Sequence, residues 1–370
     1  MPKRPKIYAL LTTIKELVPS SGDKINEINL YKAMSTFADV YYNNQLFKPN
    51  EPGFGIKPMP IDVPYNKAVD YDYCYIRNNK KVFQAFCEVR DRVIETGGDR
   101  APKVLWVASP YIEGVFKRAD AVVTYTESWK RQLKTLGSHS IGGLYNPQDT
   151  YIPDNVLVFP QAIDIDEFSN KKNHEKTLEY RKTFDADFVI SHFGRIAAGN
   201  YPHSLLHILP KVCAKYPEKK IKFIYSGLPS QIKMEIDSPS CQVVSGIPYE
   251  DMSYAISACD LVSSDYRSST ANWGGSRHVL ESMGCGTPVL TGDFTVRREQ
   301  LGENYRLFWK WEQNKGRISD RAEEEMFNHI CFLIDNPNKA AVIGQKMIAR
   351  SKSYSYEQVG IKIKSELDSI

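Results

Sequence analysis

A glycine-containing stretch near residue 275 has the features of an anion-binding turn. Gly274 and Gly275 allow a backbone to approach a ligand closely, and Ser276 is a favourable residue to begin a helix. We expect this helix to end at Gly284 or Gly286, because glycine readily adopts the left-handed conformation found at helix ends. The N–H groups and the positive dipole end at such a helix start favour a diphosphate.

Glu281 is the residue of this helix that could add a second contact to the same ligand. It follows Ser276 by five residues, or about 7.5 Å along a helix axis at a rise of roughly 1.5 Å per residue. A nucleoside that extends from a diphosphate at the helix start could meet this carboxylate, which is suited to accepting two ribose hydroxyl groups. The alternative is an ordinary turn between a strand and a helix, with Glu281 exposed to solvent.

Patterns that could bind a metal are weak in this chain. Three Asp-x-Asp triplets, at 70–72, 164–166 and 185–187, do not follow a strand end, where a catalytic metal would lie. His203 and His207 have the spacing of a helical zinc pair, but no third ligand accompanies them. We therefore expect no metal and no cofactor.

Length and composition restrict the class of protein. The chain has 370 residues, of which 42% are hydrophobic, which is enough to bury two cores. Its net charge of +4 is too small to indicate nucleic acid or a membrane surface as a partner. The seven cysteines show no close pair typical of a metal or redox site, so reduced thiols in the cytoplasm are expected. The apolar run at 7–11 is too short for a signal peptide or a membrane span.

Short apolar runs alternate with amphipathic stretches, a pattern typical of β–α units around a parallel sheet. The first series of buried strands is predicted at 7–11, 38–42, 72–76, 104–108, 121–125 and 155–159, with crossover helices at 25–37 and 80–95. The second series is predicted at 188–193, 221–226, 241–245, 259–264 and 287–291. The charged stretch at 163–186 is predicted to be a linker with a short surface helix. A terminal helix is expected from residue 354, and the sequence leaves open on which series it packs.

Six segments, in the same order along the chain, resemble the retaining glycosyltransferases of family 4, which have the GT-B fold. They are LESMGCGTPVL (280–290), SSGDKINEINLYKAMS (20–35), RADAVVTYTES (118–128), VLVFPQAIDIDEF (156–168), FGRI (193–196) and YEDMSYAISACDLVSSD (249–265). The resemblance implies an α/β fold of two Rossmann-like domains whose parallel sheets face each other across a cleft. Residues 1–163, with the helix at 354–370, would form the acceptor-side domain. Residues 164–353 would bind the nucleotide-sugar donor.

The resemblance also implies roles for individual residues. Glu281 corresponds to the glutamate that holds the donor ribose, and Arg195 to the arginine that neutralises the leaving diphosphate, where a guanidinium stabilises developing charge. Gly22, beside Ser21, corresponds to a loop that reaches toward the phosphates and the donor sugar. Arg195 in a structural salt bridge and Gly22 in a simple turn are the alternatives. The other donor-binding residues implied are Gly194, Gly246, Asn272, Trp273, Gly274, Gly275 and Ser276.

Three positions depart from the pattern of the family. Trp273 stands where the family often has a second glutamate, Asn200 where it often has a lysine, and Ser109 near the place of a frequent histidine. These departures put donor-sugar recognition and the neutralisation of the leaving group in question.

Nearby residues could compensate for these losses. Arg277 lies four residues before Glu281, on the same face of the helix, and could replace the missing lysine, so it is the second catalytic candidate. His278 is an alternative donor, although a lone helical histidine is more often structural. Asn272 or Asp265 could contact hydroxyl groups of the donor sugar.

The implied activity is transfer of a sugar from a nucleoside-diphosphate sugar, with UDP- or GDP-sugars as the expected donors, with retention of configuration and without a metal. The acceptor could be a glycan, a lipid-linked sugar, a protein or a modified nucleobase, and peripheral membrane contact is compatible with this. The sequence leaves the oligomeric state open. Two alternatives are a sugar-nucleotide epimerase of the same architecture, which would need an acid and a base beside the sugar, and a non-catalytic nucleotide-sugar binding protein.

Overall fold

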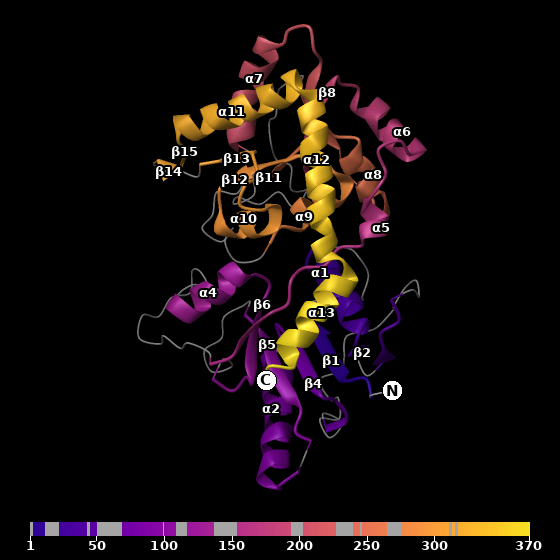
Figure 1. Cartoon of the computed structure of the whole chain (residues 1–370), viewed down its shortest axis with the longest axis vertical. Helices are drawn as coiled ribbons and strands as arrows, with labels where there is room; N and C mark the ends of the chain where they lie inside the picture. The colour runs from indigo at the N-terminus through magenta and orange to yellow at the C-terminus, as the bar shows by residue number, and fades with distance from the viewer. Residues whose placement is uncertain are drawn as a thin grey trace. The chain divides into compact units, whose positions relative to one another are not determined.

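The computed structural model describes residues 3–11, 22–42, 45–49, 69–98, 100–108, 117–136, 154–193, 203–226, 240–244, 246–264, 275–310, 313–314 and 317–370 (Figure 1). The chain divides into two compact units. The first contains Met1–Ala162 and Tyr354–Ile370, and the second contains Ile163–Ser353. Each unit is built on one sheet of mainly parallel strands, as the alternating sequence pattern predicts.

The sheet of the first unit has the order β3-β2-β1-β4-β5-β6-β7. Its strands are β1 (Lys6–Leu11), β2 (Asp39–Tyr42), β3 (Gln45–Leu46), β4 (Tyr73–Arg77), β5 (Lys103–Val107), β6 (Ala121–Thr124) and β7 (Val156–Val158). All pair in parallel except β3, which is antiparallel to β2. All six predicted strands of this half are confirmed, and the missed strand β3 is a short exposed edge with no apolar run. The strand order reverses direction between β1 and β4.

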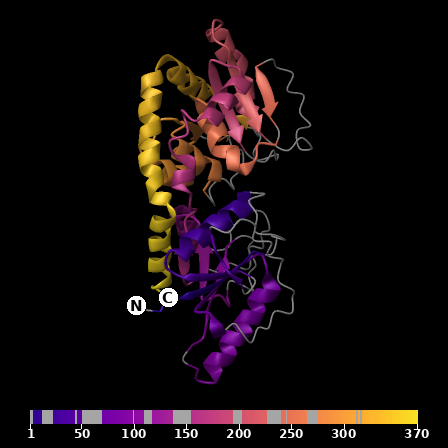
Figure 2. The ribbon, with the colours of Figure 1, turned by 90° about the vertical axis from the view of Figure 1, so that its right-hand side faces the viewer.

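The described helices of the first unit are α1 (Gly22–Ser35), α2 (Lys80–Glu95), α4 (Glu127–Leu136) and α13 (Tyr356–Leu367). The terminal helix α13 lies beside α1, as Figures 1 and 2 show. A Cβ atom on Gly360 would lie 2.6 Å from the carbonyl oxygen of Ala33, so only glycine permits this approach. The Tyr356 hydroxyl donates to Asn29 Oδ1 at 2.8 Å. The tail of the chain therefore completes the first unit.

The sheet of the second unit has the order β10-β9-β8-β11-β12-β13, with every pairing parallel. Its strands are β8 (Phe188–Phe193), β9 (Ile221–Ser226), β10 (Cys241–Val244), β11 (Leu261–Ser264), β12 (Val289–Gly292) and β13 (Phe308–Trp309). The five predicted strands are confirmed. Strand β13 was missed because two residues are too few to form an apolar run. A separate hairpin pairs β14 (Gln313–Asn314) with β15 (Arg317–Ile318). In this sheet the strand order reverses between β8 and β11.

The described α-helices of the second unit are α5 (Ile165–Phe168), α6 (Glu175–Phe184), α7 (His203–Lys215), α8 (Met252–Ser257), α9 (Arg277–Cys285), α10 (Thr295–Leu301), α11 (Asp320–Asp335) and α12 (Pro337–Ser351). Phe188 and Ile190, which alternate along β8, join a buried cluster with Leu209 of α7 and Met326 of α11. The stretch expected to be a linker contains α5 and α6, and each of these helices buries a phenylalanine at its end.

Helix α9 ends at Gly286, as predicted, and α12 packs against that end. Gly286 has φ of 70°, the left-handed conformation that a side chain disfavours. A Cβ atom on Gly344 of α12 would overlap the carbonyl oxygen of Gly286. The backbones of the two helices are therefore in close contact here. No helix in the described part of the chain is long and apolar enough to cross a membrane.

Candidate functional site

Helix α9 begins at the carboxyl edge of the second sheet, because it follows the parallel strand β11. β11 lies next to β8, where the strand order reverses. Ligands of open parallel sheets bind outside the carboxyl ends of the strands at such a reversal. The topology therefore places the start of α9 where a ligand site is expected.

Ser276 occupies the N-cap position just before α9, as predicted, but its hydroxyl does not cap the helix. The hydroxyl lies 2.9 Å from Nδ1 of His278 and makes no hydrogen bond to an amide of the first turn. The Ser276 N–H donates to Oε1 of Gln300 at 3.1 Å, and Nε2 of Gln300 donates to the Ser276 carbonyl at 3.2 Å. Nη1 of Arg297 donates to the same Oε1 at 2.7 Å. Because a guanidinium only donates, Arg297 fixes the orientation of the amide that holds Ser276.

Glu281 is buried, so the alternative of a solvent-exposed glutamate is wrong. Its side chain is 6% exposed, and Oε1 accepts a hydrogen bond from Nε of Arg277 at 2.8 Å. Burial raises the pKa of Glu281, whereas the charge and hydrogen bond of Arg277 lower it. The side chain of Arg277 is itself only 9% exposed. The predicted proximity of the two residues on one helix face is confirmed, as a buried ion pair.

Tyr249 completes this ion pair from a different segment, and sequence reasoning missed it. Nη2 of Arg277 donates to the Tyr249 hydroxyl at 2.6 Å, and the guanidinium carbon lies 5.7 Å from the centre of the tyrosine ring. A hydrogen bond from Tyr249 also lowers the pKa of Glu281. Tyr249 opens a short 3-10 helix, Tyr249–Asp251, three residues after Gly246, whose φ of 76° requires glycine. Its only sequence signal was its place in a segment that resembles the family.

Two histidines lie at the same edge of the sheet. His192, near the end of β8, is 1% exposed, and its Nδ1 lies 2.9 Å from the carbonyl oxygen of Ser263 in β11. Because a carbonyl only accepts, Nδ1 carries the hydrogen. The ring stacks on Tyr225 at 5.4 Å and lies 5.6 Å from the ring of His278.

Burial lowers the pKa of His192 to about 4. The pKa of His278 is also lowered, by burial first and then by His192 and Arg297. Both rings are therefore neutral at neutral pH. His278 can donate a hydrogen bond but supplies no positive charge to a leaving group.

The other predicted site residues divide into two groups. Gly22 is the first residue of α1, and Gly275 directly precedes Ser276 at the start of α9. The remaining candidates lie outside the described residues: Ser21, Ser109, Gly194, Arg195, Asn200, Asp265, Asn272, Trp273 and Gly274.

The first sheet has its own buried polar cluster at the strand reversal between β1 and β4. Oε1 of Glu27, on α1, accepts from Nη1 of Arg77 at 2.9 Å and from the hydroxyls of Tyr125 at 3.0 Å and Tyr75 at 3.4 Å. Arg77 ends β4 and Tyr125 follows β6, so these bonds tie α1 to the carboxyl edge of the sheet. Glu27 is fully buried. The cluster therefore fixes the orientation of α1, whose first residue is Gly22.

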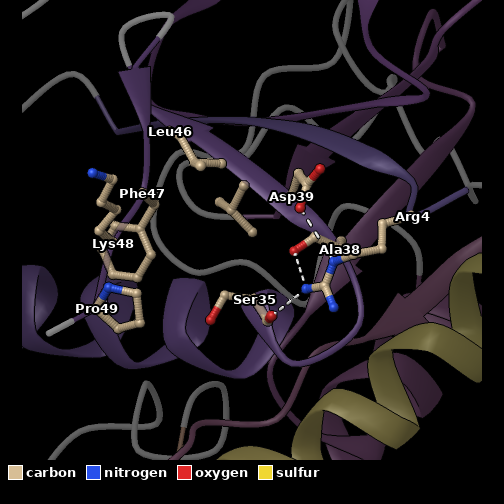
Figure 3. A pocket seen from close by; sticks show the side chains of 9 residues that line it. Arg4, Ser35, Ala38, Asp39, Leu46, Phe47, Lys48 and Pro49 are labelled. Atoms are coloured by element: carbon tan, nitrogen blue, oxygen red, sulfur yellow. Dashed lines mark hydrogen bonds and ion pairs between the residues drawn. The ribbon is translucent and has the colours of Figure 1, made fainter.

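A cavity of about 420 Å³ lies at the opposite edge of the first sheet, near the amino ends of β1 and β2 (Figure 3). Arg4 lines it and donates to the carbonyl oxygens of Ser35 at 2.6 Å and Ala38 at 2.9 Å, and to Oδ1 of Asp39 at 3.2 Å. These bonds join the end of α1 to the start of β2. The cavity holds none of the predicted site residues.

The acidic triplets and the histidine pair have structural contacts. Asp164 caps α5 through the N–H of Glu167, and Asp185 forms an ion pair with Lys220. His207 contacts Glu323. Among the residues that the structure describes, no group of three or more His, Cys, Asp or Glu side chains could hold a metal ion.

The chain resembles known proteins in its three-dimensional structure. No protein-family model matches it, and no curated protein matches its sequence. Solved structures that are similar over almost the whole length include the following three. HepE from Anabaena in complex with UDP is 15% identical, with all of both chains covered and a TM-score of 0.65. Sucrose-phosphate synthase from Thermosynechococcus elongatus is 12% identical, with 99% of both chains covered and a TM-score of 0.67. A glycosyltransferase from Rickettsia africae is 13% identical, with 99% of this chain and 100% of the other covered and a TM-score of 0.64. The chain therefore has the GT-B fold expected from the sequence.

Proposed function

We propose that this protein is a glycosyltransferase that moves a sugar from a nucleoside-diphosphate sugar to an acceptor. The observation that carries the proposal is the buried Glu281–Arg277 ion pair in the first turns of α9, at the strand reversal of the second sheet. A carboxylate in that position can accept ribose hydroxyls from a nucleotide whose diphosphate meets the helix start. HepE, of similar fold, has been seen with UDP and with UDP-glucose, so we propose a UDP-sugar as the first donor to test.

In the proposed reaction the bond between the anomeric carbon and the diphosphate oxygen breaks, and an acceptor hydroxyl bonds to the same face of that carbon. The proton of the acceptor passes to the leaving phosphate, so no protein base is needed and configuration is retained. Arg195 would stabilise the charge that develops on the diphosphate.

The unit Ile163–Ser353 would hold the donor, and the unit Met1–Ala162 with Tyr354–Ile370 would bind the acceptor. The cysteines whose side chains are described are free thiols, which supports a cytoplasmic location.

The test of the donor site is binding to the wild type and to Glu281→Gln. A thermal-shift screen over UDP-, GDP-, ADP- and TDP-sugars selects the base, because a ligand of the native state raises its stability. The substitution keeps the shape of the side chain but removes a charge that strengthens hydrogen bonds by about 1.5–3 kcal/mol. Affinity for the selected ligand should fall by roughly ten- to a hundredfold.

Two controls accompany this test. Glu303→Gln changes a glutamate that is 74% exposed, and it should bind like the wild type. A 2′,3′-dideoxy nucleotide should bind the wild type and Glu281→Gln almost equally. If the substitution weakens the dideoxy and hydroxylated ligands to the same extent, or if no nucleotide sugar stabilises the wild type, the proposed donor site is wrong.

Product analysis separates transfer from the two alternatives. With donor and candidate acceptors, a transferase releases the nucleoside diphosphate and forms a glycosylated product. Recovery of an isomerised donor in the absence of any acceptor would instead indicate an epimerase. Donor binding without release or isomerisation would indicate a binding protein.

A further inference from the structure

We propose that Arg277 and Tyr249 are positioning residues that hold Glu281 for the ribose, and that Arg277 does not neutralise the leaving diphosphate. The inference rests on the proposed function, because it concerns the same donor site. It differs from the expectation drawn from the sequence, in which Arg277 replaced a lysine that faces the leaving group.

The contacts of the guanidinium carry the first step of the argument. Arg277 donates from Nε to Glu281 at 2.8 Å and from Nη2 to the hydroxyl of Tyr249 at 2.6 Å. The guanidinium therefore links the two side chains, because it donates to the carboxylate through one nitrogen and to the tyrosine hydroxyl through another. A guanidinium that is itself held by Tyr249 keeps the carboxylate of Glu281 in one orientation, which is the requirement for pairing with two adjacent hydroxyl groups.

The position of the Arg277 ion pair on the helix supports the same role. Arg277 is the first residue of α9, and Glu281 lies one turn further along the helix. Side chains of a helix normally lean toward its start, where the diphosphate would lie. Nε of Arg277 lies 2.8 Å from Oε1 of the residue at i+4, so its charge is already paired with the carboxylate of Glu281.

Burial makes this arrangement costly to break. Glu281 and Arg277 are 6% and 9% exposed, so a guanidinium that moved to the diphosphate would leave a buried carboxylate without its cation. The Tyr249 hydroxyl would lose its hydrogen bond at the same time. A ligand phosphate would have to compensate for both losses. A ribose that binds the carboxylate of Glu281 leaves the ion pair and the tyrosine hydrogen bond intact.

The two roles differ in which part of the nucleotide they affect. A residue that orients the ribose contact changes the affinity for a nucleoside and for its diphosphate by the same factor. A residue that contacts the diphosphate changes only the affinity for the diphosphate. The ratio of the two dissociation constants therefore separates the roles, and a general loss of folding would remove binding of both ligands together with the thermal transition.

The experiment measures the binding of uridine and UDP, or of guanosine and GDP if the thermal-shift screen selects that base, to Tyr249→Phe and Arg277→Gln. We expect Tyr249→Phe to weaken both ligands about three- to tenfold and Arg277→Gln to weaken both roughly ten- to a hundredfold. Within each variant the ratio of nucleoside to diphosphate affinity should stay within about threefold of the wild type.

Matched controls lie in the same unit. Tyr254→Phe removes a phenol hydroxyl from the same segment as Tyr249, where the ring contacts His174. Arg321→Gln breaks another i, i+4 pair of arginine and glutamate, on the exposed side of α11. Both should bind like the wild type. The inference is overturned if Arg277→Gln weakens the diphosphate at least tenfold more than the nucleoside, or if Tyr249→Phe binds like Tyr254→Phe. A wild type that binds neither ligand would refute the proposed function itself.

Discussion

His192 gives the most direct test of the electrostatics of the second unit. Its ring is 1% exposed and packs against the rings of Tyr225 and His278, with Nδ1 donating to the Ser263 carbonyl. Burial lowers its pKa from the usual 6.5 to about 4. Above pH 6.5 the ring is neutral in the folded and unfolded states, so it makes no pH-dependent contribution. Between pH 6.5 and 4 the unfolded chain binds a proton that the folded protein does not, and the free energy of unfolding falls.

The size of this loss follows from the pKa difference. Because each pKa unit is worth about 1.4 kcal/mol, protonation of His192 costs roughly 3 kcal/mol in total, of which about 2 kcal/mol is lost between pH 7 and pH 5. His192→Asn retains a side-chain N–H near the Ser263 carbonyl and cannot be protonated. We expect this variant to lose about 2 kcal/mol less than the wild type over that interval.

The assay is urea unfolding at pH 7 and pH 5, with amide hydrogen exchange of β8 and β11 as the signal, because two units need not unfold in one transition. His207→Asn, which replaces a histidine that is 67% exposed, is the control for the loss of a histidine outside the core. If His192→Asn and the wild type lose the same stability between pH 7 and pH 5, His192 is not a buried neutral group and the reasoning fails.

Three further predictions concern catalysis and packing. EDTA should leave turnover nearly unchanged, because arginine is proposed to neutralise the leaving group; a loss that magnesium or manganese restores would contradict this. Arg195→Ala should lower turnover on the order of a hundredfold with little change in donor affinity, and normal turnover in this variant would mean that Arg195 is structural. Gly344→Ala should lower the free energy of unfolding by about 1–3 kcal/mol, since a Cβ would press on the Gly286 carbonyl oxygen. An unchanged melting temperature would contradict that close contact.

Several features of the protein could be predicted from the sequence because they depend on neighbouring residues. The apolar runs identified every long strand of both sheets, since burial on both faces of a parallel sheet requires a nearly continuous apolar sequence. The limits of α9 followed from Ser276 and Gly286, because helix ends are decided by the conformations available to one or two residues. The two-residue strands β3 and β13 were missed because a pattern needs more residues than they contain.

Only the tertiary structure decided which side chains meet and which are buried. Tyr249 reaches Arg277 across 28 residues, and Arg77 reaches Glu27 across 50 residues, so no local spacing could indicate either contact. The hydroxyl of Ser276 turns to His278, although its residue type favours capping the helix. A solvent-exposed Glu281 was one of the two readings that the sequence allowed, yet its side chain is buried and paired with Arg277. The free energy of a polar side chain depends on its solvent exposure and on its partners, and in this site the folded chain supplies both from distant segments.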